Sequence, residues 1–235
     1  MTTMTVRPAK FEASGLLELG RWFLLGSAIA FLIPYLFTSV WEINHDIYYG
    51  IYFAAVAAFL VAFIRSEDVD VRALLSANWQ LSLGVGVLAA GFVVMNVLRN
   101  EDSTPHPAGL YFAFEIGWRG LLYGVVDALM LTAFPAALAL AFVGGKLQGV
   151  ASRLTFAGVA LGLTIVLTAV YHLGYAQFRD DGVVAPEIGN TIISVPALVS
   201  ANPVGSVIAH ASMHLAAVTH SYETDTFLPP QTNAD

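Results

Sequence analysis

A few ionisable side chains stand inside apolar stretches of the sequence, and their spacing places them on shared helical faces. Glu115 and Arg119 lie four residues apart within the apolar segment 108–126, so they face the same side of a helix. His210 and His214 have the same spacing in the last apolar segment. A charged residue at the centre of a bilayer costs about 2.5 to 3.5 kcal/mol on insertion scales, so such residues usually face a protein interior and mark a site.

The histidines of the last apolar segment belong to a longer polar stripe that begins at Ser206. Interhelical hydrogen bonds, each typically worth below about 1 kcal/mol, are the structural alternative for such a stripe. Asp127 is expected at a helix junction that reaches the membrane interface, and His45 and Asp46 in a solvated turn. We therefore predict one shared site that excludes these three residues. Its members are Glu115, Arg119, His172, His210 and His214.

Two chemistries fit these residues. In the first, Glu115 acts as a general base on water, and a histidine orients the water or stabilises the developing oxyanion. In the second, His172, His210 and His214 bind a divalent metal such as zinc together with an acid, since histidines four residues apart are a helical ligand pair. The sequence leaves both open.

Other chemistries are excluded or poorly supported. The chain has no cysteine, so disulfides, thiolate metal sites and a cysteine nucleophile are excluded. A glycine-rich phosphate loop and a nucleophile elbow are both lacking, which argues against phosphoryl transfer and serine hydrolysis. The net charge is −7, and the ten Lys and Arg residues form no basic stripe, so nucleic acid is not an expected partner.

The composition predicts the kind of scaffold that positions these residues. Hydrophobic residues make up 57% of the 235 residues and charged residues only 11%, whereas a soluble domain carries roughly 25% charged residues. The chain is therefore predicted to be a single integral membrane domain, residues 1–235, in contact with membrane lipid. Residues 1–19 form a polar lead and residues 221–235 a polar tail.

The apolar segments predict an all-α polytopic transmembrane bundle of about eight helices. Segment 108–143 is too long for one straight helix across a core of about 30 Å, so we divide it into two spans. A single helix kinked near Pro135 is the alternative; it gives seven helices and reverses the sidedness of all later segments. The predicted helices cover residues 20–41, 47–64, 79–98, 108–126, 127–143, 154–175, 188–201 and 204–219.

The basic residues predict the orientation. Under the two-span interpretation six Lys and Arg residues lie on the N-terminal side of the membrane and three on the other. The positive-inside rule then places the N-terminus in the cytoplasm. We expect a multi-pass protein of a prokaryotic plasma membrane; the oligomeric state is not predicted.

The order of motifs in residues 108–220 resembles the CPBP family of intramembrane endopeptidases, which includes CAAX prenyl proteases and bacteriocin-processing or immunity proteins. The first family motif is a glutamate pair followed by arginine. Glu115 and Arg119 match it, and Phe114 stands in place of the first glutamate. The second motif is an aromatic residue four positions before a histidine. His172 matches that histidine, and Thr168 stands in place of the aromatic residue.

The third family motif is a late helix opened by glycine and serine, with histidine and then asparagine four residues later. Gly205, Ser206 and His210 match it, and His214 stands in place of the asparagine. The resemblance implies an enzyme without a cofactor that hydrolyses a peptide bond of a membrane-associated peptide or protein with glutamate-activated water. It also implies that His172 and His210 keep the family roles.

Three functions follow from the residues and the resemblance together. Glu115 serves as the base of an intramembrane endopeptidase, or the chain is a non-catalytic membrane interaction or immunity protein that has lost the first motif glutamate. The third function is a proton- or metal-linked transporter that uses the histidine stripe.

Overall fold

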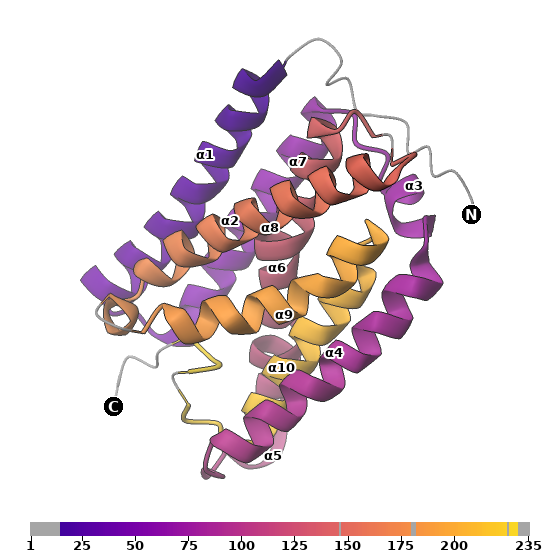
Figure 1. The fold of residues 1–235 in the computed structure, drawn as a ribbon. Coiled ribbons are helices and arrows are strands. Elements are labelled where there is room, and N and C mark those ends of the chain that lie inside the picture. Colours follow the sequence, from indigo (N-terminus) through magenta and orange to yellow (C-terminus); the bar gives the residue numbers. More distant parts are fainter. Residues whose placement is uncertain (1–14, 146, 180–181, 225, 230–235) are drawn as a thin grey trace.

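The computed structural model describes residues 15–145, 147–179, 182–224 and 226–229, and these residues contain helices and loops but no strand (Figure 1). The predicted all-α class is confirmed, and continuous helical segments number eight within the described ranges, although one of them is the unpredicted α3 and two predicted spans form one helix. The α-helices are α1 (Gly15–Pro34), α2 (His45–Ser66), α3 (Val71–Ser76), α4 (Trp79–Asn100), α5 (Gly109–Glu115), α6 (Tyr123–Ala128), α7 (Phe134–Phe142), α8 (Val150–Leu173), α9 (Val184–Ser200) and α10 (Val204–His220).

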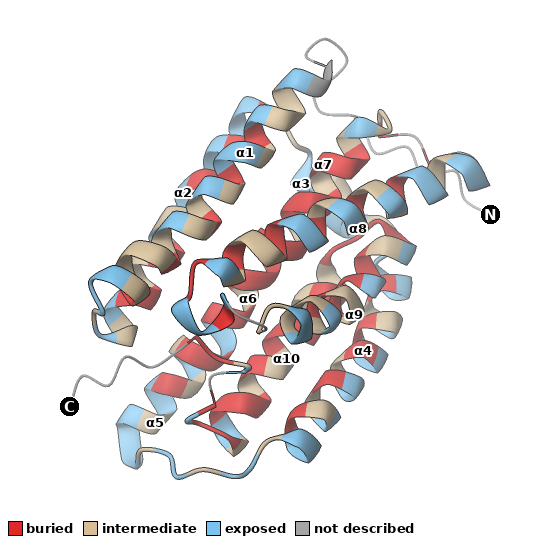
Figure 2. Ribbon diagram, turned by 60° about the vertical axis from the view of Figure 1, so that its left-hand side comes forward, coloured by how far each residue is buried: buried red, intermediate tan, exposed pale blue. Residues whose placement is uncertain are grey.

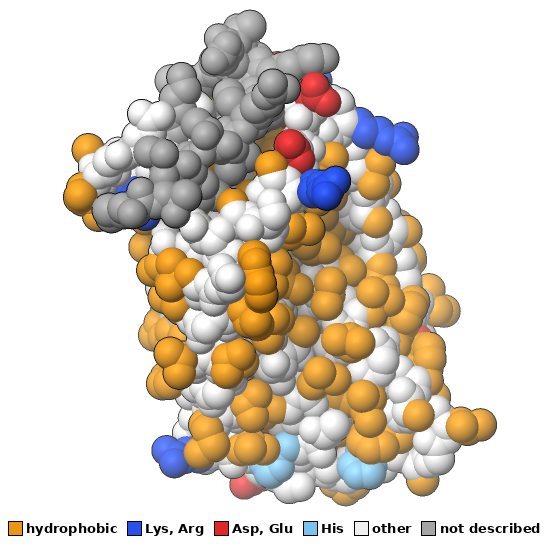
Figure 3. Space-filling view, turned by 90° about the vertical axis from the view of Figure 1, so that its right-hand side faces the viewer, with side chains coloured by type: hydrophobic (Ala, Val, Ile, Leu, Met, Phe, Trp, Pro, Cys, Tyr) orange, Lys and Arg blue, Asp and Glu red, His pale blue; other side chains and the backbone are white. Residues whose placement is uncertain are grey.

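Five helices are long and apolar enough to cross a membrane. They are Leu17–Val40, His45–Ser66, Trp79–Asn100, Gly109–Phe142 and Val150–Leu173. The space-filling view in Figure 3 shows hydrophobic side chains over the middle of the molecule and Lys, Arg, Asp and Glu side chains towards its two ends. This distribution is that of an integral membrane protein, because charged groups are costly in hydrocarbon and gather at the interfaces.

The division of segment 108–143 into two spans is wrong. Gly109–Phe142 is one helix of 34 residues, about 51 Å long at 1.5 Å per residue; we call it the central helix. It joins α5, α6 and α7 through wider π-helical turns at Ile116–Leu122 and Leu129–Ala133. The second of these turns comes directly before α7 and its Pro135, which lacks a backbone N–H for regular helical bonding.

The position of the central helix explains why it does not break. It has the largest buried share of the five long helices, and Figure 2 shows buried residues along α6 and α7. Neighbouring helices cover most of its middle, while residues nearer its ends such as Leu110 and Phe142 stay exposed. Because its middle packs against protein, the segment continues as one helix. Each loop after the central helix consequently lies on the opposite side of the membrane from the side that the two-span division gives.

Close glycine contacts bring α10 against α4 and α6. A Cβ added at Gly205 would lie 2.0 Å from the carbonyl oxygen of Ser82 on α4, and one added at Gly86 would lie 2.4 Å from the Cα of Gly205. On the other side, a Cβ at Gly124 of α6 would lie 2.7 Å from the Cα of Ala211. Small residues allow such backbone approach, and this packing brings the histidine stripe of α10 against the central helix.

The turn between α9 and α10 is held by Asn202. Its side-chain Nδ2 donates to the carbonyl oxygens of Leu75 in α3 (2.8 Å) and of Ala77 just after α3 (2.7 Å), and its Oδ1 accepts from the backbone N–H of Val204 (2.9 Å). The short helix α3, which is not among the predicted helices, therefore anchors the start of α10.

Candidate active site

The central helix and α10 place a carboxylate against two imidazoles. Asp127, on α6, is 3% exposed, and its Oδ2 lies 3.4 Å from Nε2 of His210. The rings of His210 and His214 stack with centroids 5.0 Å apart and planes inclined by 12°. One potential ligand atom from each of the three residues lies within 4.8 Å of the others. We call Asp127, His210 and His214 the Asp–His–His cluster.

A cavity of about 390 Å³ adjoins this cluster. His172, His210, His214 and Asp127 line it together with mainly apolar residues. Phe92 on α4 and Ile188 on α9 also line the cavity and are 55% and 59% exposed, so the cavity reaches the apolar outer surface of the bundle. A mostly apolar cavity with a few convergent polar groups is the usual form of a small-molecule or active site.

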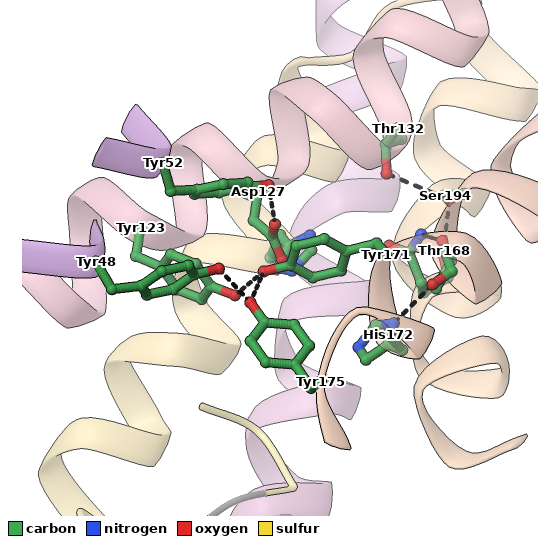
Figure 4. Close-up of polar contacts among 12 residues, drawn as sticks. Tyr48, Tyr52, Tyr123, Asp127, Thr132, Thr168, Tyr171, His172, Tyr175 and Ser194 are labelled. Carbon is green, nitrogen blue, oxygen red and sulfur yellow. Dashed lines mark hydrogen bonds and ion pairs between the residues drawn. The ribbon is translucent and has the colours of Figure 1, made fainter. Parts of the chain in front are cut away.

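Tyrosine hydroxyls surround the carboxylate (Figure 4). The Tyr52 hydroxyl donates to Oδ1 of Asp127 at 2.7 Å. Beside it, the hydroxyls of Tyr48, Tyr175, Tyr171 and Tyr123 form a connected chain of hydrogen bonds from α2, α6, α8 and the segment after α8. Because all these side chains are buried, the chain satisfies hydroxyl groups that would otherwise be costly in a dry interior. The Tyr52 hydrogen bond holds Asp127 in place, and the tyrosine chain packs beside it.

His172 lies at another part of the cavity. Its Nδ1 is 2.8 Å from the backbone carbonyl oxygen of Thr168, and because a carbonyl only accepts, Nδ1 carries the proton. In a neutral ring, Nε2 then keeps its lone pair. Thr168, which replaces the aromatic residue of the resembled motif, is buried and its Oγ1 accepts from Nδ2 of Asn190 at 2.6 Å. Asn190 also lines the cavity.

Glu115 and Arg119 belong to a different cluster. Oε2 of Glu115 accepts from the Tyr222 hydroxyl at 3.1 Å and lies 3.9 Å from Nε2 of His45. The Arg119 guanidinium carbon lies 4.8 Å from the centre of the Tyr222 ring. His45, Asp46 and Glu115 also hold potential ligand atoms within 4.8 Å of one another. Burial and the neighbouring Glu115 raise the pKa of Tyr222 to about 12, so its hydroxyl remains a donor at neutral pH.

The five predicted site residues thus divide into two groups. His172, His210 and His214 line one cavity, whereas Glu115 and Arg119 are fully buried elsewhere and are not among its lining residues. Glu115 and Asp127 are separated by twelve positions on the central helix, about 18 Å of helical rise. The carboxylate beside the histidines is therefore Asp127.

The sequence analysis missed several members of these clusters. The expectation that Asp127 lies at a junction is wrong, because it sits within a continuous helix and is buried. His45 and Asp46 are partly buried beside Glu115 rather than in a solvated turn. The alternative of one helix over residues 108–143 could have identified Asp127, because in such a helix Asp127 lies at membrane depth.

Phe114, which stands in place of the first glutamate of the resembled motif, faces outward. Phe114 is 45% exposed and stacks on Trp118 with ring centroids 5.6 Å apart. The group of potential metal ligands also differs from the predicted one. His210 and His214 lie close to Asp127, and His172 is not part of this group.

No protein-family model matches the sequence, and the searches of characterised proteins and of solved structures found no match either.

Proposed function

We propose that the protein is a membrane-embedded hydrolase that cleaves a peptide bond of a membrane-associated substrate. The observation that carries the proposal is the convergence of Asp127, His210 and His214 on a largely apolar cavity of about 390 Å³. Such a cavity is large enough for water and part of a substrate, since a single water needs only about 10 to 15 Å³.

The Asp–His–His cluster supplies the means to activate water. A carboxylate and imidazoles held at one place take a proton from water as it attacks a carbonyl carbon. The new oxygen–carbon bond then replaces the carbon–nitrogen bond, and the leaving amine takes up a proton. His172, which also lines the cavity, is placed to exchange a proton with the substrate. No covalent intermediate with the protein is needed.

Two features of the cavity favour a peptide from the membrane. Asn96 and Asn190 line its wall, and Oδ1 of Asn190 has no hydrogen-bond partner among the described residues. Side-chain amides pair well with the N–H and C=O groups of an extended peptide. The exposed lining residues Phe92 and Ile188 offer an apolar route from lipid.

The orientation proposed for the protein keeps its N-terminal end in the cytoplasm. In the described helices and loops, basic residues at that end outnumber those at the other, four to two, as the positive-inside rule requires of a cytoplasmic side. The four are Arg21, Arg65, Arg72 and Arg153, and the two are Arg99 and Arg179. Since Asn100 and Glu101 line the cavity, its mouth then faces away from the cytoplasm.

The test is cleavage of membrane-tethered peptides by the purified protein in lipid nanodiscs, read by mass spectrometry. Asp127→Asn should reduce the rate at least 100-fold, because the carboxylate loses its charge without a change in size. Glu115→Gln is the matched control, and we expect it to retain cleavage. Unreduced activity in Asp127→Asn would refute the role of this carboxylate.

A non-catalytic membrane interaction protein is the second candidate. The observation that favours it is that both oxygens of Asp127 have partners, Tyr52 and His210, as in a structural network. This function predicts that the parent protein cleaves none of the tethered peptides, while Asp127→Asn still lowers its melting temperature.

A further inference from the structure

We propose that the Asp–His–His cluster, Asp127, His210 and His214, binds a divalent transition metal, with zinc as the best match. The metal's catalytic role rests on the proposed hydrolase function: side chains that bind a metal no longer take the proton from water, and the metal would instead make the bound water more acidic. Metal binding is measurable independently of that function.

The positions of the ligand atoms are close to those of a metal site. Zinc bonds to imidazole nitrogen and carboxylate oxygen are about 2.0 to 2.2 Å long, so ligand atoms in a tetrahedral site lie roughly 3.3 to 3.5 Å apart. Asp127 Oδ2 and His210 Nε2 are already 3.4 Å apart. All three ligand atoms lie within 4.8 Å of one another, so a side-chain movement of His214 of at most about 1.4 Å brings its ligand atom to the same separation.

Unpartnered nitrogen atoms are the independent sign of a ligand. His214 is only 3% exposed, and among the described residues neither of its ring nitrogens reaches a side-chain partner in hydrogen-bond geometry; the backbone of Phe227 is a polar group near the ring. Buried polar groups are normally hydrogen-bonded, and exceptions often mark an ion. A metal at the cluster, bound to His210 through Nε2, gives one ring nitrogen of His214 a partner.

The surroundings hold Asp127 and His214 in place. The Tyr52 hydroxyl bonds the second oxygen of Asp127 at 2.7 Å, as outer partners of metal carboxylates do. The ring of Tyr123 packs edge-on against His214, with centroids 4.7 Å apart and planes at 75°. Three protein ligands leave the fourth zinc position for water or substrate, on the side of the cavity.

The other candidate group, His45, Asp46 and Glu115, is a weaker metal site. Oε2 of Glu115 already accepts from Tyr222, and the positive Arg119 guanidinium lies beside that tyrosine. A second positive charge is disfavoured there. Two imidazoles and one carboxylate, by contrast, are ligands that suit zinc rather than magnesium or calcium.

The experiment measures metal in the full-length protein, purified with a histidine-free tag and without chelators, by inductively coupled plasma mass spectrometry. We expect about one zinc per chain. Asp127→Asn and His214→Gln should lower this content at least tenfold, whereas Glu115→Gln should leave it unchanged. Equal zinc content in the parent and both cluster variants, or none in the parent, would overturn the proposal.

A second measurement covers the case in which a cluster variant does not fold. The parent is stripped with a chelator, and its melting temperature is recorded before and after zinc is added. Adding zinc should raise the melting temperature of the stripped parent and of stripped Glu115→Gln by several degrees. If the melting temperature of the stripped parent does not rise, the proposal is contradicted. If zinc binds but no peptide is cleaved, the proposed hydrolase function is refuted and the metal site stands. If cleavage survives complete chelation, the catalytic role of the metal is refuted and the hydrolase function stands.

Discussion

Replacing Gly124 with alanine should push α6 away from α10 and break the contact between Asp127 and His210. A Cβ at position 124 would lie 2.7 Å from the Cα of Ala211 and 3.1 Å from Cδ2 of His214. Carbon atoms in contact normally lie about 3.5 to 4.0 Å apart. Because the Ala211 atom belongs to the backbone, the two helices must separate by about 1 Å.

The expected loss of stability is modest, because two terms oppose each other. Alanine is more favourable than glycine within a helix by roughly 0.5 to 1 kcal/mol, whereas overpacking costs about 1 to 3 kcal/mol. The net destabilisation is therefore about 0 to 2 kcal/mol. The site is more sensitive, since a displacement of about 1 Å can reduce a catalytic rate about 100-fold. A displacement of that size would lengthen the 3.4 Å separation of Asp127 and His210 beyond any hydrogen bond.

The assay compares the cleavage rate and the melting temperature of the parent and Gly124→Ala in nanodiscs. Gly158→Ala on α8 is the matched control, because nothing lies within 4 Å of a Cβ added there; it should keep full activity. The reasoning is refuted if Gly124→Ala cleaves at the parent's rate, or if both alanine variants lose the same activity.

Two further predictions concern stability. Tyr222→Phe should cost about 1.5 to 3 kcal/mol, since it removes a hydrogen bond to the Glu115 carboxyl. Because the pKa of Tyr222 is raised to about 12, its hydroxyl stabilises the fold below pH of about 10 and loses this effect as the pH rises to 12; unfolding of Tyr222→Phe should show a weaker pH dependence in that interval. Asn202→Ala should cost about 2 to 4 kcal/mol, since it removes bonds to Leu75, Ala77 and Val204. Chemical unfolding followed by circular dichroism checks both, and a loss below 0.5 kcal/mol would contradict either one.

Composition and local spacing were enough to predict the scaffold and part of the site. A chain with 57% hydrophobic and 11% charged residues has no stable arrangement in water that buries so much apolar surface, so a membrane bundle followed directly. The shared face of His210 and His214 also followed, because helical periodicity is a property of the chain itself. Both histidines do line one cavity with His172.

Which of the two acids, Glu115 or Asp127, lies beside the histidines of α10 depended on tertiary structure. Glu115 and Asp127 are both acids in one apolar region, and local spacing cannot tell which of them faces α10. That was decided by the continuity of the central helix and by the close approach of Gly124 to Ala211. Sequence by itself determines which residues share a helical face, because the repeat of 3.6 residues is local; only the packing of helices distant in the chain determines what that face meets, and here it meets Asp127.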